Sequence, residues 1–440
     1  MESINSNSYY IETYGCAANK ADSAIMETAL RNSGYHKTTF EQAKYVIINT
    51  CAVKQATENK LRARLKDIYA YSQKHTSKKI IIAGCLPHVS PDYTDIIKEL
   101  IPTFSAIIGL NSISNIPDII RKIEEGAENI IISSEKKIDK AHCLSKHSTN
   151  KLTAIIPISE GCYGACTYCC VKNARGALKC YEPQSIISSA EHYLKRGTKQ
   201  LYLTSQDCSN YKFDSTSLAD LIRDINALPY DFFLRLGMIN PSYLYEHLDQ
   251  VIQILQFNKV YQFLHIPIQS GSNRILKKMN RPYIISQILG KIALLRKKFP
   301  YLTISTDIIC GFPSESEYEF YNTINIIKWL QPEILNISQF TPRPNTKAKE
   351  MEQLSSEIIK DRSTRLSKVF RQSLNYLNEK WKGWEGKILV LHEGTEENQV
   401  FGRNFAYKNV FLKEHNVELG TFVNVKITKV EGFNLYAKRI

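Results

Sequence analysis

A chain of 440 residues with 43% hydrophobic and 23% charged side chains is long enough for about two to four domains, and this composition excludes a disordered, fibrous or collagen-like protein. No apolar run reaches the roughly 18–20 residues of a membrane-spanning helix, and the polar start lacks the layout of a signal peptide, so we expect a cytoplasmic protein without a membrane partner. The net charge of +14 is concentrated in residues 136–380, with 33 basic and 21 acidic side chains, which favours either a polyanionic partner such as nucleic acid or a generally basic surface.

The first third of the chain repeats one pattern three times: a short apolar stretch, a cysteine and a helix-length segment. The cysteines that end the three stretches are Cys16, Cys51 and Cys85. Such alternation predicts βαβ units, and we expect an N-terminal parallel α/β domain over residues 1–135. Because the carboxyl ends of parallel strands meet at one edge of a sheet, the three thiols would gather there and suit a metal ion or an iron–sulfur cluster. Three separately buried, inert cysteines are the alternative.

A polar segment without periodicity, residues 136–152, is expected to be a linker. Alternation resumes after it, and we expect a domain over residues 153–375 that forms a partial (β/α)6 barrel with its site at the carboxyl ends of the strands. The predicted strands are 154–159, 200–204, 232–236, 261–267, 302–309 and 334–340, and the predicted helices include 184–196, 242–256 and 316–330.

A basic helix is predicted over residues 361–371, with Arg362, Arg365 and Lys368 near one face. This face either meets solvent or contacts phosphate groups. Beyond Trp381 the pattern changes to short alternating strands at 388–391, 400–403, 409–412, 422–427 and 434–437. They predict a small antiparallel β-barrel over residues 380–440, similar to oligonucleotide-binding barrels. Its charge is nearly neutral, so RNA contact there would depend on shape and aromatic groups.

The strongest chemical signal is a C-x3-C-x2-C loop directly after a predicted strand, formed by Cys162, Cys166 and Cys169. Three thiolates in one loop can hold three irons of a [4Fe–4S] cluster and leave the fourth iron open to another ligand. A four-thiolate zinc site, completed by Cys170 or Cys180, is the alternative.

This loop, at the start of a (β/α) barrel, resembles the signature of radical S-adenosylmethionine (SAM) enzymes. Together with the three N-terminal cysteines and a TRAM-like RNA-binding barrel at the end, it makes nearly the whole chain similar to the radical SAM methylthiotransferase family. Several further segments resemble the archaeal and eukaryotic branch of that family, which modifies N6-threonylcarbamoyladenosine at position 37 of tRNA to its 2-methylthio derivative. These segments are 50–54, 174–178, 235–241, 265–272, 306–313 and 342–346.

The resemblance implies two [4Fe–4S] clusters and SAM as cofactors. Cys162, Cys166 and Cys169 would hold the cluster that cleaves SAM, and Cys16, Cys51 and Cys85 would hold a second cluster that carries the inserted sulfur. The implied partners are the tRNA anticodon stem-loop, a low-potential electron donor of the flavodoxin or ferredoxin type, and a sulfur donor. Cys170 and Cys180 stand where the family leads us to expect other residue types.

Four residues at predicted strand ends are candidates for binding SAM: Gln206, Asp207, Arg235 and His265. Asp207 could equally cap a helix, and His265 could be structural. Two other functions remain open. One is methylthiolation of a different acceptor, either isopentenyladenosine in tRNA or an aspartate of a ribosomal protein. The other is an RNA-binding protein whose metal sites, closed by four ligands, are only structural.

Overall fold

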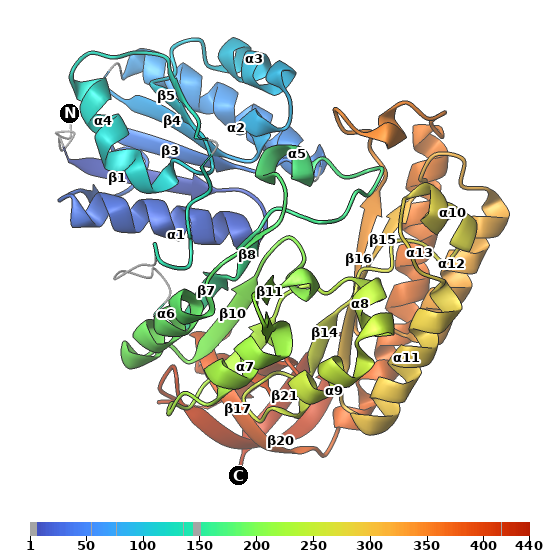
Figure 1. The fold of residues 1–440 in the computed structure, drawn as a ribbon. Coiled ribbons are helices and arrows are strands. Elements are labelled where there is room, and N and C mark those ends of the chain that lie inside the picture. Colours follow the sequence, from blue (N-terminus) through green and yellow to red (C-terminus); the bar gives the residue numbers. More distant parts are fainter. Residues whose placement is uncertain (1–6, 54, 76, 135, 144–150, 415) are drawn as a thin grey trace.

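The computed structural model describes residues 7–53, 55–75, 77–134, 136–143, 151–414 and 416–440. Three bodies follow one another along the chain: an α/β sheet, a larger half-open barrel and a small β-barrel packed beneath it (Figure 1). None of the helices in the described part of the chain is long and apolar enough to cross a membrane.

The N-terminal body is a parallel sheet with the strand order β2-β1-β3-β4-β5-β6. Strand β3 lies inside the sheet and all six of its residues are buried: the run 45–48 is apolar, and the side chains of Asn49 and Thr50 form hydrogen bonds. Helices α1 and α4 cover one face, and α2 and α3 cover the other. The bounds are β1 Ser8–Thr13, α1 Ala17–Asn32, β2 His36–Lys37, β3 Tyr45–Thr50, α2 Gln55–Lys74, β4 Lys79–Gly84, α3 Pro91–Leu100, β5 Ala106–Ile108, α4 Ile116–Glu124 and β6 Ile130–Ile132.

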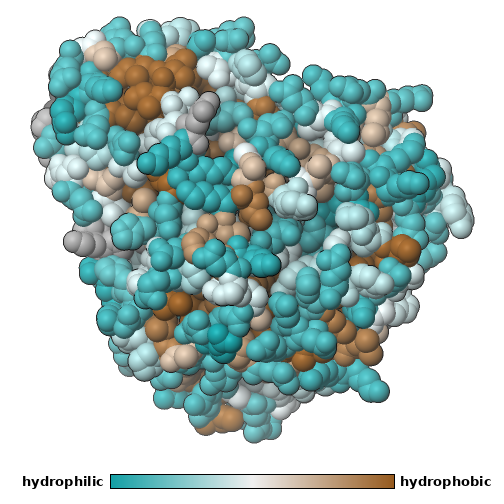
Figure 2. Space-filling view, viewed as in Figure 1, coloured by the Kyte–Doolittle hydropathy of each residue, from teal (hydrophilic) through white to brown (hydrophobic). Residues whose placement is uncertain are grey.

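The face of the molecule seen in Figure 2 is mostly hydrophilic, but a hydrophobic patch lies over this N-terminal body. The edge strand of the N-terminal sheet, β6, is a run of isoleucines, and the side chain of Ile131 in this strand is half exposed. The predicted α/β domain with a parallel sheet is confirmed.

The central body is the predicted partial barrel of parallel strands. Strands β7, β10 and β13 form one half and β14, β15 and β16 the other. Isolated parallel bridges, Leu234 to Val260 and Met238 to His265, join the halves. The strands are β7 Thr153–Pro157, β10 Gln200–Thr204, β13 Phe233–Leu236, β14 Phe263–His265, β15 Thr303–Cys310 and β16 Ile334–Gln339.

Helices cover the outside of this barrel and follow the predicted segments closely. The predicted helix 242–256 is divided in two, because His247 has φ −129° and ψ 42° and leaves the helical conformation. The helices are α5 Val171–Arg175, α6 Pro183–Lys195, α7 Leu218–Asn226, α8 Pro241–Glu246, α9 Leu248–Gln256, α10 Asn273–Lys278, α11 Ile285–Lys298, α12 Glu317–Leu330 and α13 Ser356–Leu377. Short strand pairs, β8 Ser159–Glu160 with β9 Lys179–Cys180 and β11 Lys212–Phe213 with β12 Thr216–Ser217, lie between them.

The C-terminal body is a closed barrel with the order β17-β18-β19-β21-β20. The prediction that it is antiparallel is wrong at one contact, since β19 and β21 run parallel. A closed ring with an odd number of strands cannot alternate in direction all the way round, so one parallel pair is unavoidable in this five-stranded barrel. The strands are β17 Glu385–Glu393, β18 Gln399–Asn404, β19 Asn409–Lys413, β20 Phe422–Glu431 and β21 Asn434–Arg439.

The small barrel packs on the amino ends of the central strands. The backbone N–H of Gln262, just before β14, donates to Phe405 O over 2.8 Å. The hydroxyls of Tyr407 and Tyr202 are 2.6 Å apart, and the Tyr407 ring lies 5.0 Å from that of Tyr261. The carboxyl ends of the central strands are thereby left open towards the N-terminal body (Figure 1).

Candidate cofactor and substrate site

The three N-terminal cysteines lie where three neighbouring parallel strands end. Cys16 follows β1 and precedes α1, Cys51 follows β3, and Cys85 follows β4. Gly15, with φ +116°, lets the chain pass close to Cys51: a Cβ at this position would lie 2.8 Å from the Cys51 Sγ. The structure therefore brings the three thiols to one edge of the sheet, and the space beside them depends on a glycine.

The cysteines of the second motif lie in the loop between β8 and α5. Gly164 lies inside this loop, and a Cβ there would be 3.4 Å from the Cys162 Sγ and 4.0 Å from the Cys166 Sγ. The Arg281 guanidinium lies 3.6 Å from the Cys166 Sγ. Burial raises the pKa of the Cys169 thiol to about 12. Such a thiol stays protonated at neutral pH unless a metal takes the place of its proton.

Each set supplies three thiols, which fits a [4Fe–4S] cluster held through three of its irons. In the described residues no three Cys, His, Asp or Glu side chains converge as one metal ion would require. The two cysteines of the zinc alternative have other neighbours: the Cys170 thiol donates to Ala52 O over 3.4 Å, and the Cys180 thiol contacts Asn210 O at 3.7 Å.

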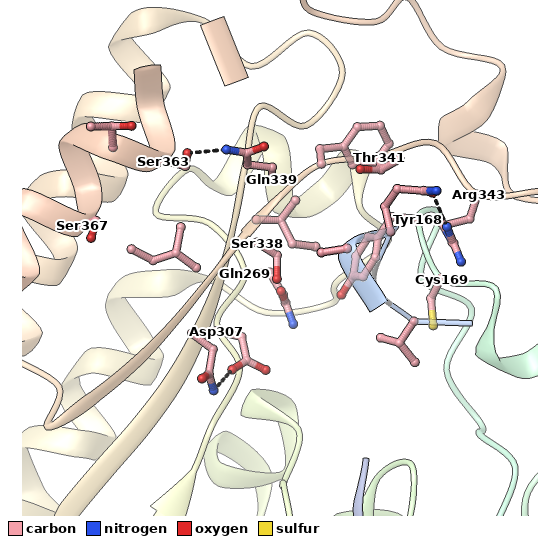
Figure 3. A pocket seen from close by; sticks show the side chains of 18 of the residues that line it. Tyr168, Cys169, Gln269, Asp307, Ser338, Gln339, Thr341, Arg343, Ser363 and Ser367 are labelled. Atoms are coloured by element: carbon pink, nitrogen blue, oxygen red, sulfur yellow. Dashed lines mark hydrogen bonds between the residues drawn. The ribbon is translucent and has the colours of Figure 1, made fainter. Parts of the chain in front are cut away.

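A cavity of 1480 Å³ lies between the cluster loop, the carboxyl ends of the central strands, α13 and the start of α2 (Figure 3). Tyr168 and Cys169 belong to its wall, and so does Val53, two residues after Cys51. The cavity therefore borders the cluster loop through Cys169, whereas Cys16, Cys51 and Cys85 are not among its lining residues. A second cavity of 730 Å³, lined by Cys166 and Arg281 among others, lies beside the same loop.

Polar groups of β14, β15 and β16 form one end of the larger cavity (Figure 3). The Nε2 atom of His265 lies 3.0 Å from Oδ1 of Asp307. Asn336 Nδ2 donates a hydrogen bond to the same oxygen over 2.7 Å. Gln269 points into this space with its backbone at φ +63°, a conformation that non-glycine residues seldom adopt. The sequence analysis did not name Gln269 or Asp307 as site residues. Gln269 lies in segment 265–272 and Asp307 in segment 306–313, both of which carried the family resemblance.

The four predicted SAM residues are not all at the cavity. His265 lines it, and Gln206 accepts a 2.6 Å hydrogen bond from the N–H of Gly161 and so holds the start of the cluster loop. Asp207 is buried and caps a short 3-10 helix, Cys208–Asn210, by accepting from the N–H of Ser209 at 3.0 Å. This is the helix-capping alternative that the sequence left open, and burial raises the pKa of this carboxyl.

Arg235 lies deeper, at the level of β13, and is not among the residues that line the cavity. Its guanidinium lies over the rings of Tyr202 at 5.2 Å, Phe263 at 4.9 Å and Tyr407 at 5.2 Å. Arg235 therefore packs against the floor of the barrel, which Tyr407 of the C-terminal body helps to form.

A buried group of charged side chains links Cys85 of the N-terminal set to the segments on either side of the cluster loop. Arg175, six residues after Cys169, donates from Nε to the Cys85 Sγ over 3.2 Å. The same guanidinium bonds Asp22 of α1 and Glu160 of β8, each at 2.7 Å. Lys140, in the predicted linker, bonds both carboxylates at 2.8 and 2.6 Å. Residues 144–150 of that linker lie outside the described residues.

Comparison with known proteins agrees with this arrangement. The family models that match are the uncharacterised protein family UPF0004 over residues 8–109, the radical SAM superfamily over 156–327 and the TRAM domain over 382–440. The solved structures of the radical SAM methyltransferase TsrM from Kitasatospora setae (TM-score 0.57, 14% identity, 78% of this chain and 75% of that one) and of the radical SAM enzyme OxsB (TM-score 0.53, 11% identity, 83% and 56%) share the fold.

Curated relatives cover nearly the whole chain. A probable threonylcarbamoyladenosine tRNA methylthiotransferase of Pyrococcus horikoshii is 39% identical over 409 residues, which are 92% of this chain and 93% of that one. The threonylcarbamoyladenosine tRNA methylthiotransferases of Drosophila melanogaster and Homo sapiens are each 33% identical, over 97% and 95% of this chain and 76% and 71% of theirs.

A UPF0004 sheet, a radical SAM barrel and a TRAM barrel in one chain, with one set of three cysteines at the sheet edge and another in the loop that begins the barrel, define a radical SAM methylthiotransferase. Membership of the radical SAM superfamily implies a [4Fe–4S] cluster and SAM. Among such enzymes, the chain belongs to the threonylcarbamoyladenosine tRNA methylthiotransferases.

Proposed function

We propose that this enzyme uses its two cysteine sets for two different clusters while it inserts a methylthio group at C2 of N6-threonylcarbamoyladenosine-37. Cys162, Cys166 and Cys169 would hold the SAM-cleaving cluster, and Cys16, Cys51 and Cys85 would hold the second cluster. The observation that carries this proposal is that each set gathers its thiols in one place, the N-terminal set at the ends of neighbouring parallel strands and the other in one loop, and that Arg175, just after this loop, donates to Cys85 of the N-terminal set. When bound, the first cluster supplies the electron that cleaves SAM, and the second supplies sulfur.

The protein's own groups arrange the reactants. Gln206 fixes the start of the cluster loop through Gly161, and Asn280 Nδ2 donates to Ala165 O of the same loop over 2.8 Å. The His265–Asp307 pair offers a fixed polar contact at the end of the cavity. Because the cavity is open at the carboxyl end of the barrel, the seated tRNA would complete the exclusion of bulk water and other hydrogen donors from the reacting atoms.

The tRNA would approach from the open carboxyl end of the barrel. The base at position 37 lies in the anticodon loop, and single-stranded loops are what proteins read on RNA, because unstacked bases can turn outward into a pocket. The basic central domain and the TRAM barrel would contact the anticodon stem-loop. A low-potential electron donor of the flavodoxin or ferredoxin type, a sulfur donor, the cytoplasmic location and the domain boundaries stay predictions from the sequence.

The experiment combines metal analysis with nucleoside analysis. Anaerobically reconstituted protein should contain about eight irons and eight sulfides, and each triple cysteine-to-alanine variant about four of each. Incubation with SAM, reductant and tRNA bearing the N6-threonylcarbamoyl group should give the 2-methylthio nucleoside by mass spectrometry. Cys180→Ser is the matched control and should keep full iron content and activity. The assignment of the two cysteine sets to two clusters would be contradicted by either of two results. One is wild-type protein with only about four irons, and the other is a triple variant of either set that keeps all eight.

A further inference from the structure

The helix α13 forms one wall of the large cavity and presents a polar face to it. The side chains that line the cavity from this helix are Ser363, Thr364, Ser367, Lys368, Arg371 and Gln372. Spacings of three and four residues place these side chains on one face of the helix. Apolar side chains of α13, such as Leu366 and Phe370, are buried on the opposite side.

The cations of α13 and of the cavity lining differ in their pairing. Arg362 of the same helix pairs with Glu315 at 2.9 Å, Arg365 pairs with Asp361 at 3.0 Å, and Arg343 across the cavity pairs with Glu58 at 2.9 Å. Lys368 and Arg371 are exposed at the cavity, and within the described residues no carboxylate forms an ion pair with either.

The cavity therefore has two unpaired positive charges at its α13 wall. The carboxylate in its lining, that of Asp307, is already bound by His265 and Asn336. An anionic group of a ligand would be attracted to α13 and repelled from Asp307. The volume of 1480 Å³ exceeds the roughly 300–1,000 Å³ that one drug-sized ligand needs, so a nucleoside with a long substituent fits beside SAM.

We propose that Lys368 and Arg371 bind the carboxylate of the threonyl group on the substrate base and so select a base that already bears the threonylcarbamoyl group. This inference rests on the proposed function. The threonyl carboxylate is the one negative charge that this base has beyond adenine, and arginine can bind a carboxylate through two parallel N–H···O bonds. Ser367, one turn from Arg371 on the same face, also lines the cavity and would offer its hydroxyl to the threonyl hydroxyl.

The test compares two anticodon stem-loops that differ only in the threonylcarbamoyl group at position 37. Binding to the holoenzyme is measured by fluorescence anisotropy for the wild type and for Lys368→Gln, Arg371→Gln and the double variant. Lys360→Gln is the control, since Lys360 is an exposed cation of α13 that does not line the cavity. The double variant should lose at least tenfold in affinity for the modified loop and keep its affinity for the unmodified one.

Other results would refute the proposal of a carboxylate subsite. Equal losses for both loops, with a weaker salt dependence, would show that the two cations contact phosphates. An unchanged preference in the double variant, or a wild type that binds both loops equally, would also overturn the proposal. A different result would show that the proposed function is wrong: wild-type protein that contains both clusters but yields no methylthio product.

A second inference comes from the buried charged group. Arg175 lies just after the SAM cluster loop, yet its Nε–H donates to Cys85 of the other set over 3.2 Å. Glu160 and Asp22 each accept a hydrogen bond from one of the two terminal nitrogens of the guanidinium, so its orientation is determined. We infer that Arg175 is a positioning residue for the second cluster. Hydrogen bonds to the sulfur ligands are among the factors that determine the reduction potential of an iron–sulfur cluster.

The test isolates the second cluster in a parent protein with Cys162, Cys166 and Cys169 changed to alanine. Arg175→Lys keeps the charge and loses the Nε–H. It should keep about four irons but show a more negative midpoint potential and an altered electron paramagnetic resonance spectrum. The variant Asp22→Asn/Arg175→Gln also removes the bond and keeps the buried group neutral, so it serves if the single variant does not fold. An unchanged potential and spectrum, or folded protein without iron, would refute the inference.

Discussion

Replacing Asp22 with asparagine should destabilise the contact between the N-terminal and central bodies strongly. Asp22, Lys140, Glu160 and Arg175 are 1%, 1%, 3% and 5% exposed, and four ion pairs of 2.6–2.8 Å join them. The group holds two positive and two negative charges, and the variant would leave two cations with one carboxylate. Breaking a buried pair costs about 3–5 kcal/mol because the remaining charge stays desolvated.

Differential scanning calorimetry of the apo-protein under anaerobic conditions measures this loss. For domains of this size about 1 kcal/mol corresponds to roughly 2–4 °C, so Asp22→Asn should lower the melting temperature by about 6–20 °C. Asp95→Asn is the matched control, because the exposed Asp95–Lys98 pair should be worth less than about 1 kcal/mol.

The charge balance of this buried group predicts a second result. The double variant Asp22→Asn/Arg175→Gln leaves one cation, Lys140, facing one carboxylate, Glu160, at 2.6 Å. It should therefore recover a part of the stability that the single variant loses, which a double-mutant cycle measures as a coupling of at least about 1 kcal/mol. A single variant that loses no more than the Asp95→Asn control would refute this reasoning.

Three further predictions concern other parts of the chain. Changing Cys16, Cys51 and Cys85 together to alanine should stop methylthiolation but preserve SAM cleavage, measured as 5′-deoxyadenosine; loss of both in a folded variant would contradict the division of roles. Burial alone would raise the pKa of Glu319, but hydrogen bonds from an arginine and from serine groups lower it to about 2. Its contribution of up to about 3 kcal/mol should be present above pH 4.5 and disappear as the pH falls towards 2, and Glu319→Gln should flatten this part of the stability–pH curve in urea unfolding. Tyr407→Ala should cost about 3 kcal/mol of unfolding free energy and Tyr407→Phe about 1 kcal/mol, since only the former removes the ring packed between the two barrels; equal losses would contradict that packing role.

Features that depend on neighbours in the sequence could be predicted from the sequence. The apolar run 45–48 lies in the fully buried strand β3, and residues 200–204 form a strand with the predicted bounds. The cysteines at strand ends could be placed at one edge because every parallel βαβ unit returns the chain in the same direction. Periodicity within one element and the repetition of one pattern along the chain carry this information.

Other features depended on which groups meet across the fold. Asp22 and Arg175 are 153 residues apart, and no local pattern marks them as partners. The same holds for Arg235, which was expected at the cavity but packs against Tyr407 of the C-terminal barrel. Of the predicted basic face of α13, Arg362 and Arg365 are neutralised by acidic partners, while Lys368 lines the cavity. Only tertiary packing decides which charges are paired and which remain free for a ligand, because pairing depends on distances between segments that the sequence keeps far apart.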